Sequence, residues 1–368
     1  REMGIRPVMV YSEADKDSLA VRIADKAVCI GPPSSKKSYL NVDNLISAAL
    51  LTDCDAVHPG VGFLAENANF AQKVIDAGLI WIGPEPSVIR LLGDKVAAKQ
   101  TAIKHGVPVI PGSGGPVRQI EAAKKSAEEI GYPIIVKAAS GGGGKGMRIV
   151  RKPEDLADIL SIASNEAEMA FSDGTVYLEK YFESPRHVEV QLLADGNANV
   201  VHLGERDCTV QQNHQKLIEE SPSPVVDEDM REQMGSDAVR LFKAISYIGA
   251  GTIEFLVNEG SYYFMEVNAR VQVEHPVTEM LTGVDIIWEQ ILSCSGRSLG
   301  LTQDELQIEG YAIECRVNAS APGTISNYLP PGGFKVRIDS FLYNNYTVVP
   351  FYDALIAKVI VGAKDREE

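Results

Sequence analysis

The sequence predicts a protein of mixed α/β and α+β structure with several domains, and three observations lead to this class. Up to about residue 108, short apolar strands alternate with helical stretches, as in α/β units. A glycine-rich segment at 138–146 lies between two short strands. From about Tyr181 the chain becomes richer in strands, which is typical of a separate sheet domain. We therefore expect three domains, which cover residues 1–108, 109–180 and 181–368.

The first domain should be an α/β unit. Its predicted strands and helices are Val8–Tyr11, Ala56–Val57, Asn44–Leu51 and Ala68–Ala77. The chain opens on Arg1-Glu-Met-Gly-Ile, which has the pattern of a helix end that leads into a strand. We therefore expect a first strand and helix to precede it.

The second domain should be a small unit entered through a Gly/Pro-rich connector, Val107–Pro116. It is predicted to hold a helix at Ala122–Ile130 and a hairpin of Ile134–Lys137 and Met147–Val150. The hairpin tip contains four consecutive glycines but no following helix, so it fits neither a Rossmann turn nor a Walker A loop. Such a tip allows backbone N–H groups to approach phosphates, although a flexible surface hairpin is an equal alternative. Lys137 beside it favours phosphate binding.

The third domain should contain a hairpin that carries two carboxylates. Its predicted strands are Thr252–Val257 and Ser261–Glu266, with further short strands around Lys335–Arg337 and Leu355–Val361. If the turn centres on Gly260, Glu254 lies directly opposite Glu266, and adjacent carboxylates repel unless a cation lies between them. Oxygen ligands from Glu254, Glu266 and Asn268 suit Mg²⁺ or Mn²⁺ rather than zinc.

The run Glu266–Glu274 alternates polar residues with Val or Ala, which is the period of a strand. In an extended chain one face would carry Glu266, Asn268, Arg270, Gln272 and Glu274. A half-buried strand with a wetted polar side is the commoner explanation of such a pattern. The neighbouring carboxylate of Glu254 makes this face a candidate active site instead.

Composition limits the possible partners. The 368 residues are 45% hydrophobic and 23% charged, and no apolar run approaches the ~20 residues of a membrane span. The net charge of −15 argues against non-specific nucleic-acid binding, so local Lys and Arg must bind any anionic substrate. Five cysteines without CxxC spacing indicate reduced thiols. We expect a cytoplasmic protein, or one of an organelle matrix in a eukaryote, without membrane or nucleic-acid partners.

Together these motifs resemble the biotin carboxylase members of the ATP-grasp superfamily over essentially the whole chain. The matching segments are His58–Asn67, Gly93–Lys95, the glycine segment, Tyr177–Lys180, Pro185–Glu189, Glu205–Cys208 and Glu266–Glu279. The resemblance implies an ATP-grasp fold with an N-terminal Rossmann-like domain, a glycine-rich lid that closes over ATP, and a C-terminal antiparallel-sheet domain. It also implies a ligase that carboxylates biotin with bicarbonate and MgATP through carboxyphosphate, as in acetyl-CoA and pyruvate carboxylases.

The resemblance further implies roles for individual residues. Nucleotide contacts would come from Lys95, Lys137, Gly142, Gly143, Gly144, Glu179, Lys180, His187, Gln211 and His214. Glu254 and Glu266 match the metal ligands that the hairpin already suggests, with Asn268 beside them. Glu274 matches the base for bicarbonate, Arg270, Lys216, Gln272 and the Val273 backbone match its pocket, and Arg337 matches the stabiliser of the biotin oxyanion.

The sequence also departs from the family pattern. Val61 replaces a usual Tyr near biotin, Gln212-Asn213 replace an Arg pair, and several loop residues are missing after Asn318. The chain ends at Glu368, before the helices that normally end the family. The resemblance implies bicarbonate, a biotin carboxyl carrier, a carboxyltransferase and a second copy of the chain, as a homodimer, as partners.

Two alternatives remain open at this point. The chain could be another ATP-grasp ligase, which activates a different carboxylate as an acyl phosphate, or a nucleotide-binding module without turnover. The polar face of Arg270, Gln272 and Glu274 favours the carboxylase, because a regulatory module needs no base beside its metal.

Overall fold

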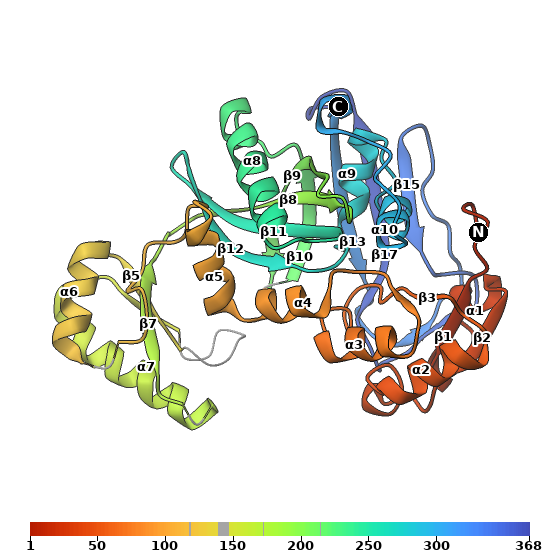
Figure 1. Cartoon of the computed structure of the whole chain (residues 1–368), viewed down its shortest axis with the longest axis horizontal. Coiled ribbons are helices and arrows are strands. Elements are labelled where there is room, and N and C mark those ends of the chain that lie inside the picture. The colour runs from red at the N-terminus through yellow and green to blue at the C-terminus, as the bar shows by residue number, and fades with distance from the viewer. Residues whose placement is uncertain (118, 139–146, 172, 214) are drawn as a thin grey trace. The chain divides into compact units, whose positions relative to one another are not determined.

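The computed structural model describes residues 1–117, 119–138, 147–171, 173–213 and 215–368. The chain forms two compact units (Figure 1). The first comprises Arg1–Val107, Arg186–Leu256 and Met265–Glu368, and the second comprises Pro108–Pro185 and Val257–Phe264. The first unit thus combines residues of the first and third expected domains, and the division into three domains stays a prediction.

The N-terminal part of the first unit is an α/β layer, as its alternating pattern predicts. Its elements are β1 (Val8–Tyr11), α1 (Leu19–Ile23), β2 (Lys26–Cys29), α2 (Val42–Leu51), β3 (Ala56–Val57), α3 (Ala68–Asp76), β4 (Ile80–Trp81), α4 (Pro86–Gly93) and α5 (Lys95–Lys104). The pairs β1–β2 and β3–β4 are parallel, as expected where helices make the connections. Helix α2 begins two residues before the prediction because the Asn41 side chain caps it by accepting a hydrogen bond from Asn44 N.

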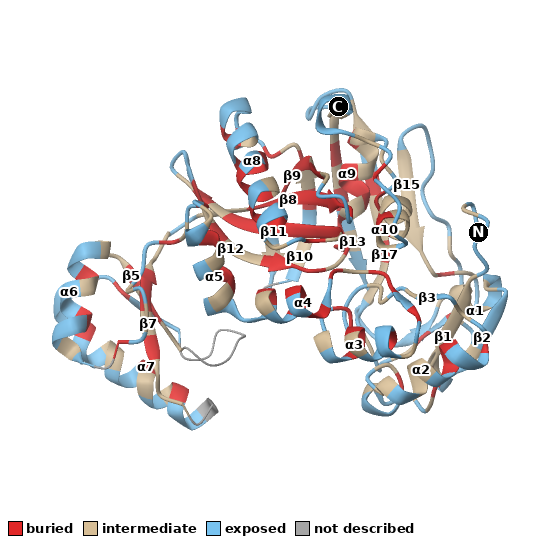
Figure 2. Ribbon diagram, viewed as in Figure 1, coloured by how far each residue is buried: buried red, intermediate tan, exposed pale blue. Residues whose placement is uncertain are grey.

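The rest of the first unit is built on an eight-stranded sheet in the order β12-β11-β8-β9-β10-β13-β17-β15, of which Val257–Phe264 belong to the second unit. Its strands and helices are β8 (Arg186–Ala194), β9 (Val200–Gln212), β10 (Gln215–Ser221), α8 (Glu228–Ala244), β11 (Gly249–Asn258), β12 (Ser261–Asn268), α9 (His275–Thr282), α10 (Ile286–Cys294), β13 (Tyr311–Asn318), β14 (Gly323–Thr324), β15 (Val336–Ser340), β16 (Thr347–Val348) and β17 (Leu355–Ala363). Strands β8, β9 and β11 are largely buried (Figure 2). Helix α8 packs on β8 and β9, whereas α9 packs on β9, β10, β13 and β17.

One face of this sheet carries two neighbouring rows of mainly charged residues. The first row crosses β10, β13, β17 and β15 and consists of Glu219, Glu314, Ile360 and Arg337, in that order. The second row crosses β13, β17 and β15 and consists of Arg316, Lys358 and Asp339. Residues two apart on a strand point to the same side, so both rows share one face. Ala312, on the same face of β13, packs against Val277 and Leu281 of α9. Helix α9 therefore covers part of this face.

The second unit is a small sheet covered by two helices. Its elements are α6 (Ile120–Ile130), β5 (Ile134–Ala138), β6 (Arg148–Val150), α7 (Leu156–Phe171) and β7 (Val176–Lys180). The strands pair antiparallel in the order β6-β5-β7, and Ile134, Val136 and Leu178 form part of its core. The predicted helix and strand pair are confirmed. The glycine tip, residues 139–146, lies outside the described residues.

The prediction of one extended strand from Glu266 to Glu274 is wrong beyond Asn268. Strand β12 ends there, the chain bends at Arg270, and Glu274 becomes the N-cap residue of α9. The backbone N–H of Ala269 donates to the Glu66 carboxylate at 3.0 Å. Pro276, in the first turn of α9, favours the start of a helix.

All five cysteines are free thiols, as their number and spacing predict. In the described part of the chain, no helix is both long and apolar enough to cross a membrane.

Candidate active site

Lys216 is the centre of a cluster of carboxylates within the first unit. Its Nζ, on β10, donates to Glu189 Oε2 at 2.5 Å, to Glu274 Oε1 at 2.8 Å and to Glu254 Oε1 at 2.9 Å. Burial lowers the pKa of this ammonium, but the surrounding carboxylates, Glu189 first, outweigh that and raise it well above its usual value. Lys216 is therefore a permanent cation that links strands β8 and β11 to the start of α9.

A fully buried arginine fixes one member of this cluster. Arg206 on β9 donates from Nε to Glu189 Oε1 at 2.7 Å, and its Nη1 donates to Gln191 and Thr278. Burial raises the pKa of Glu189, but the charges of Lys216 and Arg206 outweigh it and lower the pKa to about 2. Glu189 is therefore ionised and held between two cations.

Glu274, the predicted base, is held at both of its carboxylate oxygens. It is fully buried, its Oε1 accepts from Lys216, and its Oε2 accepts from Arg316 Nη2 at 2.9 Å. The preceding residue, Val273, accepts a hydrogen bond at its backbone oxygen from Lys358 Nζ at 2.7 Å. An ionised carboxylate has about four acceptor positions, so these two bonds fix its direction and leave room for a further partner.

The bend after β12 brings the predicted bicarbonate residues together without the extended strand. Arg270 Nη1 donates to Gln272 Oε1 at 2.8 Å, and Nη2 donates to Asn268 Oδ1 at 3.2 Å. The Nε of Arg270 donates to Glu66 Oε2 at 3.1 Å. Gln272 is in turn 3.4 Å from Glu254 Oε1. These contacts connect the guanidinium to the metal-ligand candidates.

The predicted metal ligands have different surroundings. Glu254 Oε2 accepts from His187 Nε2 at 2.7 Å, and its Oε1 accepts from Asn268 Nδ2 at 2.8 Å as well as from Lys216. Burial raises the pKa of Glu254, but the His187 hydrogen bond and the Lys216 charge outweigh it and lower the pKa to about 2. Glu266 lies 3.2 Å from Lys95 Nζ instead. Their direct opposition across the hairpin stays a prediction.

A pocket of about 180 Å³ lies beside Glu266 and Lys95. Lys95, Glu266 and Asn268 line it, together with apolar residues of α4 that include Ile89 and Leu92. A predicted phosphate-binding lysine and two predicted metal ligands therefore share one cavity.

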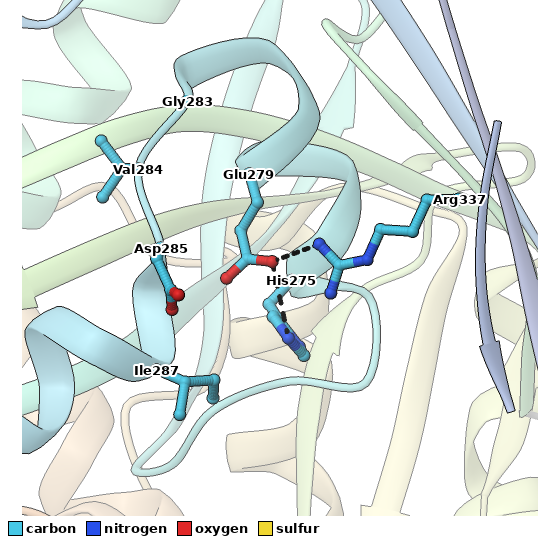
Figure 3. A pocket seen from close by; sticks show the side chains of 7 residues that line it. All are labelled: His275, Glu279, Gly283, Val284, Asp285, Ile287 and Arg337. Atoms are coloured by element: carbon cyan, nitrogen blue, oxygen red, sulfur yellow. Dashed lines mark hydrogen bonds and ion pairs between the residues drawn. The ribbon is translucent and has the colours of Figure 1, made fainter. Parts of the chain in front are cut away.

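Arg337 lines a second, open pocket of about 350 Å³ (Figure 3). Its guanidinium donates to Glu279 at 2.6 Å and to Asp339 at 2.8 Å. Burial, with a smaller effect of Lys358, lowers the pKa of neighbouring His275 to about 3, so this imidazole is neutral. The remaining lining residues are Gly283, Val284, Asp285 and Ile287.

The other predicted nucleotide contacts are placed as follows. In the second unit, Lys137 Nζ pairs with Glu179 Oε2 at 2.6 Å, and Lys180 Nζ donates to the backbone oxygens of Gly131 and Tyr132. In the first unit, Gln211 Nε2 lies 3.0 Å from His187 Nδ1. Gly142, Gly143, Gly144 and His214 lie outside the described residues.

Sequence analysis assigned no role to five charged residues of this region, which are Glu189, Arg206, Glu219, Glu314 and Arg316. A signal was present for four of them: Glu189 and Arg206 lie in the matching segments Pro185–Glu189 and Glu205–Cys208, and the other two are Glu314 and Arg316. Glu314-Cys-Arg316 lies within β13 and alternates charged and uncharged residues, the pattern that drew attention to Glu266–Glu274.

Three family models match successive parts of the chain. They are the biotin carboxylase N-terminal domain at residues 1–89, the carbamoyl-phosphate synthase L chain ATP binding domain at 94–302, and the biotin carboxylase C-terminal domain at 314–368. The expected ATP-grasp fold, with its N-terminal domain and antiparallel sheet, is confirmed.

Known proteins agree with these models. Biotin carboxylase 1 of Bacillus subtilis (strain 168) is 53% identical over 378 residues, which span 100% of this chain and 84% of the relative. The crystal structure of a biotin carboxylase–β-γ-ATP complex from Campylobacter jejuni matches with a TM-score of 0.91 and 48% identity over 99% of this chain and 83% of that one. The chain also matches a biotin carboxylase domain dimer of Hydrogenobacter thermophilus 2-oxoglutarate carboxylase, in complex with MgADP, ADP and bicarbonate. The TM-score is 0.88, and the identity is 45% over 99% of this chain and 82% of that chain. The chain therefore belongs to the biotin carboxylase family and is an ATP-dependent ligase that carboxylates biotin with bicarbonate.

Proposed function

We propose that the chain carboxylates biotin through carboxyphosphate, with Glu274 as the general base. One observation carries this assignment: Lys216 and Arg316 hold the buried Glu274 carboxylate from two sides, beside the Arg270–Gln272 pair. Glu189 is likewise held by two cations, so what favours Glu274 is its link through Lys216 and Glu254 to Gln272. Two cations orient the carboxylate, and a further acceptor position is available for a substrate proton.

The residues expected to bind Mg²⁺ fit the ion in their chemistry. All three candidates offer oxygen atoms, and Glu254 Oε2 accepts only the His187 hydrogen bond among the described residues, so it can still ligate. Glu266 would provide a second carboxylate oxygen and Asn268 a carbonyl oxygen. When bound, the metal would neutralise charge on the ATP phosphates. Lys95, which lines the same pocket, would bind a phosphate as a point charge.

The chain's own residues would then direct the proton transfers. Glu274 takes the bicarbonate proton, while Arg270, Lys216, Gln272 and the Val273 backbone hold the anion. A carbonate oxygen attacks the γ-phosphorus of ATP, and ADP leaves. Carboxyphosphate then divides into CO₂ and phosphate, and this phosphate takes the N1′ proton of biotin before N1′ attacks CO₂. The role of Arg337 is to stabilise the negative charge on the ureido oxygen.

Further contacts to the nucleotide remain part of the proposal. Lys137, Glu179, Lys180, His187 and Gln211 are the described candidates, together with Gly142, Gly143, Gly144 and His214. Lys137 forms an ion pair with Glu179 within the second unit. Glu179 is only 6% exposed, whereas Lys137 is partly accessible, so the lysine can still contact a phosphate.

The substrates and partners follow from the same reaction. Biotin would arrive on a carrier protein or domain, and a carboxyltransferase would use the product. A second copy of the chain would complete a dimer, as supported by the related domain dimer from Hydrogenobacter thermophilus. We propose a cytoplasmic location, or an organelle matrix in a eukaryote; a relative from Populus trichocarpa is named as chloroplastic.

Release of ADP by the purified chain tests this proposal. We expect ATP cleavage to require bicarbonate and to increase further when free biotin is added. Cleavage that needs a different carboxylate would identify another ATP-grasp ligase. Tight ATP binding without cleavage under any of these conditions would identify a nucleotide-binding module.

A further inference from the structure

The loop of residues 58–66, called the 58–66 loop below, ends on a carboxylate that holds Arg270. Glu66 Oε2 accepts a hydrogen bond from Arg270 Nε at 3.1 Å. Glu66 Oε1 accepts another from the backbone N–H of Ala269 at 3.0 Å. One side chain from a distant part of the sequence therefore fixes both the backbone and the guanidinium at the bend after β12.

The way in which Arg270 is held leaves one donor for an anion. A guanidinium carries five N–H groups. Nε donates to Glu66, and Nη2 donates to Asn268. Nη1 donates to Gln272 and to the backbone oxygen of Val271. The second N–H of Nη2 has no acceptor among the described residues. Because the guanidinium is planar and rigid, its bond to Glu66 determines where this remaining N–H points.

Phe63, three residues before Glu66, has a backbone conformation that needs support. Its φ is +41°, in the left-handed region, where a bulky residue is strained. The side chain is 52% exposed, so burial does not hold it. Its ring instead stacks on Tyr39, with centroids 4.9 Å apart, and meets Tyr352 edge to face at 6.0 Å. Two tyrosines thus support a strained residue of the 58–66 loop.

Hydrogen bonds fix both tyrosines in turn. Tyr39 Oη donates to Asp15 Oδ2 at 2.5 Å, and Tyr352 Oη donates to the Pro33 backbone oxygen at 2.7 Å. The two rings also meet edge to face, with centroids 5.3 Å apart. We call Tyr39, Phe63 and Tyr352 the aromatic cluster. It ties the 58–66 loop to two other segments of the first unit.

Two buried residues connect Phe63 to Glu66. Leu64 is 8% exposed and packs in the core beside α3, and Ala65 is 1% exposed. The backbone N–H of Ala65 donates to the Gly62 backbone oxygen at 2.9 Å, which closes a turn around Phe63. Close packing leaves this short link little freedom to absorb a displacement. A change in the backbone of Phe63 should therefore move the Glu66 carboxylate.

We propose that Phe63 and Glu66 are positioning residues of the bicarbonate site. Phe63, held by the aromatic cluster, fixes Glu66, and Glu66 directs the remaining N–H of Arg270 towards the anion. The proposal rests on the proposed role of Arg270 in binding bicarbonate. Loss of either residue should weaken the binding of bicarbonate by releasing the guanidinium.

NMR of arginine side chains tests the hold on Arg270 without an assay of activity. The Arg270 Nε–H signal, identified by its absence from Arg270→Lys, should exchange slowly with water because Glu66 accepts it. We expect exchange at least about tenfold faster in Glu66→Gln and at least about threefold faster in Phe63→Ala. Phe351→Ala is the matched control, since Phe351 is 53% exposed and lies against the same Tyr352, and it should exchange as wild type does. Unchanged exchange in Phe63→Ala would overturn the proposal.

Kinetics test the consequence for the substrate. KM for bicarbonate should rise about tenfold in Glu66→Gln, since the guanidinium loses a charge-assisted hydrogen bond. Phe63→Ala should raise it about threefold to fivefold while KM for ATP changes less than about twofold. Phe63→Asn should regain most of the lost affinity, because asparagine adopts the left-handed backbone more readily than alanine does. Equal rises of KM for both substrates in Phe63→Ala, or no recovery in Phe63→Asn, would contradict a positioning role.

A double variant tests the path from Phe63 to Glu66. If Phe63 acts through Glu66, the double variant Phe63→Ala with Glu66→Gln should have the bicarbonate KM of Glu66→Gln alone. Multiplied effects would show that Phe63 acts by another route. Arg270→Lys with the wild-type KM for bicarbonate would instead refute the proposed role of Arg270, and the NMR result would still judge the hold on its side chain.

Discussion

At the scale of single residues, the site depends on how buried charges are compensated. Glu189, Arg206 and Glu274 are buried, the Lys216 side chain is 13% exposed, and each of the four makes at least two hydrogen bonds or ion pairs. Buried pairs of this kind contribute more to a fixed geometry than to net stability. Removal of one member leaves the other charged and unsolvated, which makes the cluster sensitive to single substitutions.

Arg206→Met should strongly destabilise the fold. The substitution leaves Glu189 with one cation instead of two, and loss of a buried partner of this kind costs roughly 3–5 kcal/mol. The free energy of unfolding, measured with urea, should fall by about that amount. The control is Arg366→Gln, which removes an exposed pairing with Glu220 and should leave this free energy almost unchanged. Equal, small effects of both variants would mean that the cluster tolerates an unpaired charge.

Glu314→Gln should stabilise the fold at alkaline pH only. Burial on folding raises the pKa of Glu314 from 4.5 to about 8, so between these values the folded state binds a proton that the unfolded state has lost. Stability due to this group is therefore full below about pH 4.5 and decreases as pH rises towards 8. The amide avoids that loss, and we expect a gain of roughly 2–4 kcal/mol at about pH 9 and little change at about pH 5. Urea unfolding of wild type, Glu314→Gln and the exposed control Glu309→Gln at both pH values would reveal the difference; a pH-independent effect would be incompatible with a protonated Glu314.

At the scale of elements, the hairpin of β11 and β12 combines metal-ligand candidates with the start of the proposed bicarbonate pocket. Its turn lies within Asn258–Ser261, as predicted, but Glu259 and Gly260 both adopt positive φ, as expected for a two-residue hairpin loop rather than a turn centred on Gly260. The end of β12 was not predictable from alternation. After Asn268, residues at odd and at even positions are both buried, as shown by Ala269 and Gln272, so no alternation of buried and exposed residues marks the end of the strand. The side chain of Glu66, distant in sequence, accepts the backbone hydrogen bond of Ala269 in place of a neighbouring strand.

Removal of either hairpin carboxylate should raise the requirement for Mg²⁺. Glu254→Gln and Glu266→Gln each take a full charge from an all-oxygen site, and we expect the half-saturating Mg²⁺ concentration for ATP cleavage to increase about tenfold or more. Glu259→Gln, at the exposed turn of the same hairpin, is the control and should behave as wild type. Unchanged Mg²⁺ dependence in both test variants would make the two carboxylates structural.

At the scale of the whole molecule, the proposed active-site cluster gathers residues that are far apart in the chain. Glu66 meets Arg270 across 204 positions, and Glu274 meets Lys216 across 58 and Arg316 across 42. Motifs in the sequence identified the members of the cluster that lie in short recognisable segments. The partners Glu219 and Glu314 could not be paired in advance, because their opposition depends on the register between β10 and β13, which no local pattern specifies.

The central claim is that Glu274 is the base that allows bicarbonate to carboxylate biotin. Transfer of labelled carbon from bicarbonate to free biotin, measured with wild type and Glu274→Gln at equal ATP occupancy, tests it most directly. The amide keeps the shape of the side chain but cannot take a proton, so we predict that ATP binding stays nearly intact while labelled carboxybiotin forms roughly 10²–10⁴ times more slowly. Formation of carboxybiotin at the wild-type rate by Glu274→Gln would contradict the assignment.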